Sequence, residues 1–147
     1  MSRGMAGDEP LSATRSGVYR ASDARALAPS AAAGLDVVSI GLADVRAKDA
    51  LLERFAAALA FPDWFGGNWD ALEDCLGDLS WRADQGRLLL IEGFEPLASS
   101  ARDDFRVLLD LLADVAEYWS GRGRAFFVVF IDPAQKLRLR SWRDAAA

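Results

Sequence analysis

The chain has 147 residues, 52% of them hydrophobic and 27% charged, a composition that predicts one globular domain and excludes a disordered or fibrous protein. The absence of histidine and the single cysteine exclude histidine-based catalysis, histidine-bound metals, an internal disulfide and a cysteine-cluster zinc site. The net charge of −5 favours a neutral or basic partner over nucleic acid, and no apolar stretch is long enough to cross a membrane.

Residues 1–33 are rich in Ala, Ser, Gly and Arg and show no sustained hydrophobic period, which predicts a partly disordered N-terminal extension. Within it, residues 17–20 are compatible with a short extended piece. The beginning of the chain lacks the apolar run of a signal peptide, and together with the lone cysteine this predicts a cytoplasmic protein. The pattern changes at residue 34, where we expect the folded domain, residues 34–132, to begin.

The first half of this domain predicts one strand and two helices. Residues 35–40 form a short apolar run with β-branched side chains, which is typical of a strand. Apolar side chains at helical spacing over residues 47–60 predict a helix that ends before Pro62. A shorter helix is expected over residues 68–77.

The second half predicts a strand, a long helix and a further strand. Residues 87–92 are a continuous apolar run, as in a buried parallel strand, and residues 125–131 are another. Ser100 and Asp103 form an S-x-x-D helix start, and Gly121 ends the helix. The face of this helix that we expect in the core carries Phe105, Leu108, Leu109, Leu112, Ala116 and Trp119.

A basic C-terminal tail, residues 133–147, follows the domain. The alternation of Leu and Arg over residues 136–143 is compatible with an edge strand and equally with a solvated chain end. The order β-α-α-β-α-β requires helical crossovers, which predict an α/β fold with a small three-stranded parallel sheet and right-handed connections. No pattern in the chain indicates a cofactor.

The negative charge is concentrated in one part of the chain. Residues 61–84 contain six acids and one base, Arg82, so their charge is 1 − 6 = −5. The remaining residues carry 16 acids and 16 bases, and their charge is zero. The whole net charge therefore lies in this acidic window, either as a solvated helix face or as a surface that meets cations.

The arrangement within the window favours a surface that meets cations. At 100° per residue, Leu72 and Leu76 share one side of the helix, and Asp70, Asp74 and Asp78 lie on the other, flanked by Glu73. Like charges four residues apart destabilise a helix by about 0.2–0.5 kcal/mol per pair. Because no Lys or Arg balances them on this helix, the aspartates predict a functional face.

Two aromatic residues and a cysteine accompany this face. Of Trp64 and Phe65, we expect one side chain in the core and the other exposed as a stacking platform. Asn68 is the expected N-cap of the helix, because its side-chain oxygen can accept a hydrogen bond from a first-turn amide. Cys75 is expected to be a small buried hydrophobe, since the chain has no histidine that could activate it as a nucleophile.

Residues 62–76 read PDWFGGNWDALEDCL and resemble the signature of the barstar family, which are intracellular inhibitors of secreted ribonucleases. A proline, an acid, two aromatics, Gly and Asn, followed by D-A-L-x-D-C-L, form a dense and specific pattern. The resemblance covers residues 35–132 and implies the three-stranded parallel sheet of that family. It also implies that the loop and helix plug a nuclease active site, with carboxylates in the places of RNA phosphates.

Residue by residue, the resemblance implies that Asp74 is the central anchor among the cationic groups of the nuclease and that Asp70 is a second one. Trp64 takes the position of an aromatic residue that packs on the partner, and Asp114 is our guess for a further acidic contact from the last helix. The partner is expected to be a basic ribonuclease or a similar secreted toxin, and the free protein a monomer. The partner-binding set is Trp64, Gly66, Asn68, Asp70, Glu73, Asp74, Gly77 and Asp78.

The chain also departs from the family pattern. Glu73 stands where the best-known member has tryptophan, Gly77 replaces a hydroxyl residue, and Trp64 replaces the usual tyrosine. These departures motivate an alternative, in which the same fold binds a different basic protein or toxin. An enzyme that uses Asp70 and Asp74 as a catalytic pair or as Mg²⁺ ligands is disfavoured, because these helix neighbours point the same way and no second ligand cluster accompanies them.

Overall fold

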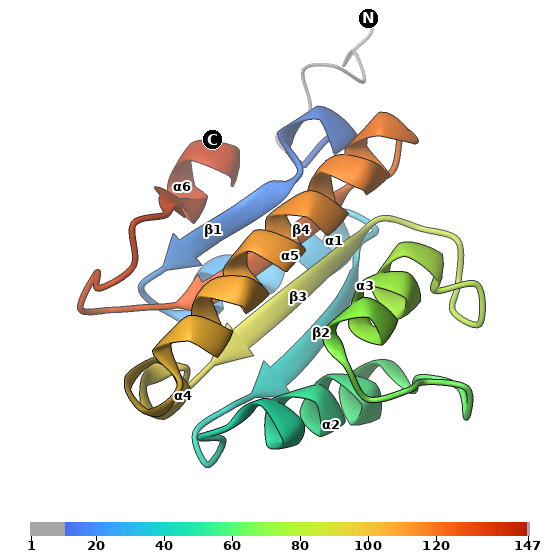
Figure 1. Ribbon diagram of the computed structural model, residues 1–147. Coiled ribbons are helices and arrows are strands. Elements are labelled where there is room, and N and C mark those ends of the chain that lie inside the picture. Colours follow the sequence, from blue (N-terminus) through green and yellow to red (C-terminus); the bar gives the residue numbers. More distant parts are fainter. Residues whose placement is uncertain (1–10, 147) are drawn as a thin grey trace, which may run out of the picture.

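The strands and main helices expected within residues 34–132 are all present in the computed structural model, which describes residues 11–146 (Figure 1). The first ten residues of the expected N-terminal extension lie outside the described range. The strands are β1 (Gly17–Ala21), β2 (Asp36–Gly41), β3 (Arg87–Glu92), β4 (Phe126–Ile131) and β5 (Arg140–Ser141). The helices are α1 (Ala28–Ala32), α2 (Lys48–Leu59), α3 (Trp69–Asp78), α4 (Glu95–Ser100), α5 (Arg102–Gly121) and α6 (Trp142–Ala146), with short 3₁₀ turns η2 (Ala13–Arg15) and η3 (Ala24–Leu27).

The sheet has five parallel strands in the order β2-β3-β4-β1-β5, so the expected count of three was wrong. The two additional strands come from the segments expected to lie outside the domain: β1 pairs with β4, and β5 pairs with β1. In β1 only Tyr19 and Ala21 are buried, and β5 has two residues, so neither strand shows a long apolar run. Their strand character depends on backbone pairing with a neighbour, which hydrophobic periodicity does not report. For residues 136–143, the edge-strand alternative is confirmed at Arg140–Ser141.

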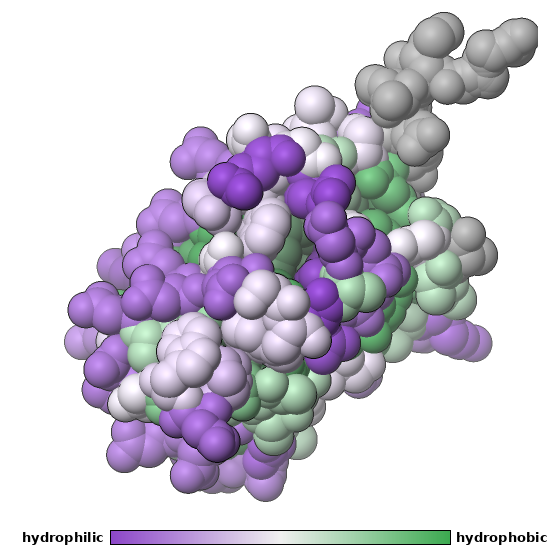
Figure 2. Space-filling view, turned by 90° about the vertical axis from the view of Figure 1, so that its right-hand side faces the viewer, coloured by the Kyte–Doolittle hydropathy of each residue, from purple (hydrophilic) through white to green (hydrophobic). Residues whose placement is uncertain are grey.

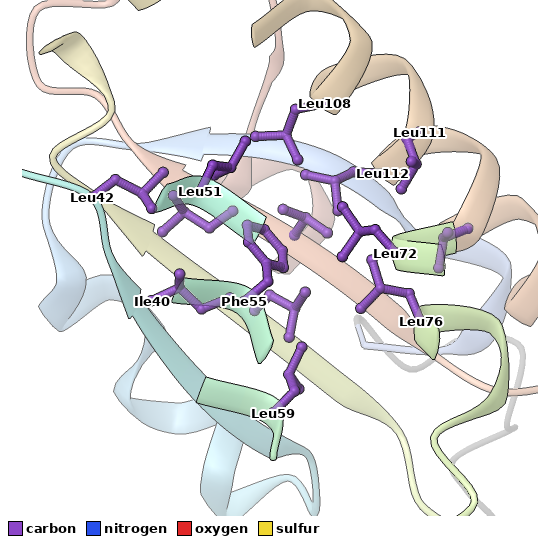
Figure 3. Close-up of a cluster of buried hydrophobic side chains, with 14 of the residues drawn as sticks. Ile40, Leu42, Leu51, Phe55, Leu59, Leu72, Leu76, Leu108, Leu111 and Leu112 are labelled. Carbon is purple, nitrogen blue, oxygen red and sulfur yellow. The ribbon is translucent and has the colours of Figure 1, made fainter. Parts of the chain in front are cut away.

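Helices α2, α3 and α5 cover one face of the sheet, and their apolar side chains form the main core against it (Figure 1). Figure 3 shows Leu72 and Leu76 of α3 directed into the cluster that contains Phe55 of α2 and Leu112 of α5. All four side chains are fully buried. Burial of such a side chain contributes about 1.5–3 kcal/mol, so the leucine side of α3 holds the helix in place.

Described segments before β2 and after β4 cover the other face of the sheet. The ring of Trp142 of α6 packs edge to face with Tyr19 of β1 and with Phe127 of β4, with ring centroids 5.6 Å and 5.3 Å apart. Trp142 is only 3% exposed, although it lies in the basic segment at the end of the chain. The segments that precede β2 and follow β4 therefore supply a second core.

The start of the long helix differs from the prediction. Helix α5 begins at Arg102 after Ala101, with no side-chain cap, and Ser100 belongs to the separate helix α4. Pro96 lies in the first turn of α4, where a backbone N–H has no partner within the helix, so proline is tolerated there. The sequence pattern predicts no helix at this position. Among residues 11–146, no helix combines the length and the apolar character that crossing a bilayer requires.

Candidate partner-binding face

The acidic helix α3 begins and ends through local hydrogen bonds. The side-chain oxygen of Asn68 accepts a hydrogen bond of 2.7 Å from the backbone N–H of Ala71, so Asn68 is the N-cap, as predicted. At the other end, Leu79 adopts the left-handed conformation with φ of 50°, and its N–H donates to the Cys75 carbonyl. Because capping uses the oxygen of Asn68, it is the side-chain nitrogen that is left for a partner.

One side of α3 is buried and the other is exposed, as its sequence period predicts. Leu72, Cys75 and Leu76 are completely buried. The indole N–H of Trp119 on α5 donates a hydrogen bond of 2.8 Å to the Leu76 carbonyl and ties the second half of α3 to the long helix. The exposed side carries four carboxylates, those of Asp70, Glu73, Asp74 and Asp78. Figure 2 views the molecule from the side on which α3 lies and shows strongly hydrophilic residues among paler ones.

No cation of residues 11–146 forms an ion pair with these four carboxylates. Arg82, the one base of the acidic window, pairs instead with Asp36 at 3.0 Å. Asp84 accepts two hydrogen bonds from the Arg124 guanidinium, and these lower the pKa of the Asp84 carboxyl. Of the six acids in the window, five therefore form no ion pair with a cation of residues 11–146: Asp63, Asp70, Glu73, Asp74 and Asp78.

The carboxylates of this face affect the pKa of Cys75 on the buried side of the helix. Burial raises the pKa of the Cys75 thiol above its ordinary value, and the carboxylates of Asp78 and Asp74 raise it further. The thiol is therefore held in its neutral form, which agrees with the expectation that Cys75 is a packing residue.

The two aromatic residues before α3 divide as expected. Phe65 packs against the core and lies edge to face with Phe61, with ring centroids 4.9 Å apart. Trp64 is 57% exposed and rests edge-on against Trp81, with ring centroids 6.1 Å apart. Trp81 is itself fixed, since its indole N–H donates to the Leu59 carbonyl. Trp64 is thus an exposed aromatic platform on a rigid base at one end of the acidic helix.

A second exposed aromatic residue was missed by the sequence reasoning. Tyr118 of α5 is 47% exposed, and its ring lies so close to Gly77 that a Cβ at that position would be 3.8 Å from it. The guanidinium of Arg122 lies 5.5 Å from the centre of the Tyr118 ring. The sequence could have indicated this exposure, because Tyr118 falls outside the apolar periodicity of α5. Asp114, the suggested further acid, is exposed on the same helix.

The loop before α3 and the helix itself carry all the predicted partner-binding residues, in one continuous stretch of chain. Seven of them are exposed and Gly77 is half-buried: Trp64, Gly66, Asn68, Asp70, Glu73, Asp74, Gly77 and Asp78. Within residues 11–146, no three Asp, Glu or Cys side chains converge on a point where they could hold a metal ion. The face therefore offers a row of separate negative charges that can meet separate positive charges.

Comparison with known proteins identifies one family. The model of the family described as Barstar (barnase inhibitor) matches residues 35–131, the stretch that contains α3 and the loop before it. No curated protein matches the chain. A solved structure of Drosophila ORC bound to DNA is 18% identical with a TM-score of 0.47, and the match covers 80% of this chain and 33% of that one.

Proposed function

The chain belongs to the barstar family, and on this premise we propose that it is an inhibitor that binds and blocks the active site of a ribonuclease, as an antitoxin or immunity protein does. In this proposal the carboxylates of α3 occupy the places of RNA phosphates, with Asp74 as the central anchor and Asp70 as the second. Trp64 packs on the rim of the nuclease cleft. The free protein is a monomer and acts in the cytoplasm.

One observation carries the proposal: the exposed face of α3 has four carboxylates and no cation that neutralises them within the described residues. A nuclease must bind polyanionic RNA, so its cleft is lined by cations, and an unneutralised acidic face is complementary to it. Such complementarity accelerates encounter, and charge pairs that lose water at the interface slow dissociation. The same charges destabilise the free helix, which is the expected sign of a face built for a partner.

Rigidity supports the same function. The leucines of α3 are fully buried, Trp119 bonds the helix backbone to α5, and Asn68 caps its first turn. A partner that meets these carboxylates spends little free energy on ordering them, because the backbone that carries them is already fixed.

The direct test is inhibition of a panel of small basic ribonucleases by the purified chain. We expect at least one nuclease to be inhibited with a stoichiometry close to one inhibitor per nuclease. The association rate should fall steeply as salt is added. The variant Trp64→Ala is expected to weaken that inhibition while the protein stays folded. If an excess of the chain leaves every nuclease fully active, the proposal is rejected.

A second candidate is a binding module of the same fold for a different basic protein or toxin. It is favoured by Glu73, which adds a carboxylate to the face, and by Gly77, which lies beside the exposed ring of Tyr118 and replaces a hydroxyl residue of the family pattern. Capture of a basic protein that has no nuclease activity, with an affinity that Glu73→Gln weakens, would support this candidate over the first.

A further inference from the structure

A second charged site lies at the carboxyl ends of β3 and β4. After β3 the chain turns into α4 and α5, which cover one face of the sheet. After β4 the loop that carries Leu137 packs against the same core before the chain reaches α6 on the other face. In Figure 1, α4 and the beginning of α5 lie at this end of the sheet. Ligands of open α/β sheets bind in crevices outside the carboxyl ends of the strands.

This crevice has an apolar floor and a basic rim. It has a volume of about 600 Å³, within the range of small-molecule sites. Apolar side chains from both segments line it, including Phe105 and Leu109 of α5 and Leu137 of the loop after β4. Its single acid is Glu95. Its four cations are Arg102, Arg106, Lys136 and Arg138.

These four cations are exposed, and none of them forms an ion pair within residues 11–146. Arg102 and Arg106 also repel each other, because they stand four residues apart on α5, and Arg102 stands at the helix start, where a cation is unfavourable. The contrast with a second cavity, beside Asp78, is clear. Its arginines are all engaged, by Asp36, by Asp84 or by the Tyr118 ring: Arg82, Arg87, Arg122 and Arg124.

The loop that carries Lys136 and Arg138 is held in place by a buried carboxylate. Asp132 is 1% exposed, and its carboxylate accepts hydrogen bonds of 2.9 Å and 2.8 Å from the backbone N–H groups of Lys136 and Leu137. A buried carboxylate that holds two amides keeps Lys136 and Arg138 beside the crevice before any ligand arrives. The site therefore has a defined shape in the free protein.

We propose that this crevice binds a small phosphate-bearing ligand, with its phosphates on the arginines and an apolar or ring portion on the floor. Guanidinium groups match phosphate oxygens in pairs, and three of the four cations are arginines. Cations from two segments converge on one crevice instead of spreading along the surface, which suits a compact anion better than an extended acidic peptide. The inference is independent of the proposed nuclease inhibition, because α3 contributes nothing to this crevice.

The test is isothermal titration calorimetry of the full chain at low salt with three probes: inorganic pyrophosphate, ATP and a short poly-glutamate peptide. We expect pyrophosphate and ATP to bind, ATP more tightly because of its ring system. Arg106→Gln and Arg138→Gln are each expected to weaken binding by roughly tenfold, as loss of a charge-assisted hydrogen bond does. The matched control is Arg143→Gln, which removes an exposed cation on α6, outside the crevice.

A variant of opposite sign makes the test sharper. Glu95→Gln removes the one negative charge of the crevice, so binding of pyrophosphate should become tighter, while a merely structural role for Glu95 would weaken it or leave it unchanged. The proposal is overturned if neither phosphate probe binds, if only the poly-glutamate peptide binds, or if Arg143→Gln weakens binding as much as Arg106→Gln. Inhibition of a ribonuclease should be the same for Arg106→Gln as for the unchanged chain, which keeps the two proposals separable.

Discussion

Replacing Asp74 by asparagine separates the charge of the acidic face from its shape. The side chain keeps its size and has a similar helix propensity, and Asp74 forms no ion pair within the described residues, so no partner is left unpaired. The change removes two like-charge pairs, with Asp70 and with Asp78, each of which destabilises the helix by about 0.2–0.5 kcal/mol. The free energy of unfolding should therefore rise by about 0.4–1 kcal/mol at low salt.

The same change should abolish inhibition at working concentrations. Removing one member of a desolvated charge pair weakens the binding free energy by about 2–5 kcal/mol, a range that includes measurements on complexes of this family. This corresponds to a Kd that is raised by roughly 30-fold to several thousand-fold. Urea unfolding measures the stability and a nuclease assay measures the inhibition. The two effects have opposite signs, which a general loss of folding cannot produce.

The matched control is Asp103→Asn. Asp103 is an exposed carboxylate in the first turn of α5, where the helix dipole favours a negative charge, so its removal should lower stability by about 0.3–1 kcal/mol and leave inhibition unchanged. The reasoning is refuted if Asp74→Asn inhibits like the unchanged chain, or if it lowers the free energy of unfolding by more than about 1 kcal/mol.

Three further predictions concern the fold. Asp132→Ala leaves two backbone amides of the following loop without their acceptor and should lower the free energy of unfolding by about 1–3 kcal/mol per amide that stays buried; an unchanged denaturant midpoint would contradict this. Trp142→Ala empties a site in the second core and should cost about 3–5 kcal/mol, whereas a loss below 1 kcal/mol would mean that α6 adds little to the fold. Because the pKa of Cys75 is raised in the folded protein, its contribution to the free energy of unfolding is complete below pH 9.0 and is lost as pH rises through the folded pKa. Denaturant unfolding at pH 8 and pH 10 should show this decline in stability, and Cys75→Ala should show a smaller one. Equal declines in both proteins would disprove the link to Cys75.

The central strands and the acidic helix could be predicted because their signals are local. The apolar runs around Val38, Leu89 and Val128 correspond to β2, β3 and β4 to within about one residue at either end. For β1 and β5 the sequence offered only an extended piece over residues 17–20 and an edge-strand alternative over residues 136–143. Tyr19 and Ala21 are the only buried residues of β1, and its pairing partner lies more than a hundred residues further along the chain. Tertiary pairing decided that these segments are strands of the sheet, which their own composition left open.

The charge of the candidate site illustrates the same division. The helical period alone placed Asp70, Asp74 and Asp78 on one side of a helix and the leucines on the other, because that geometry is set within ten residues of chain. Only the folded structure decided that Arg124, forty residues away, pairs with Asp84 and that Arg82 pairs with Asp36, so that neither arginine pairs with a carboxylate of α3. Periodicity reports which side of an element is apolar, while the pairing of charges depends on which distant segments the sheet topology brings together.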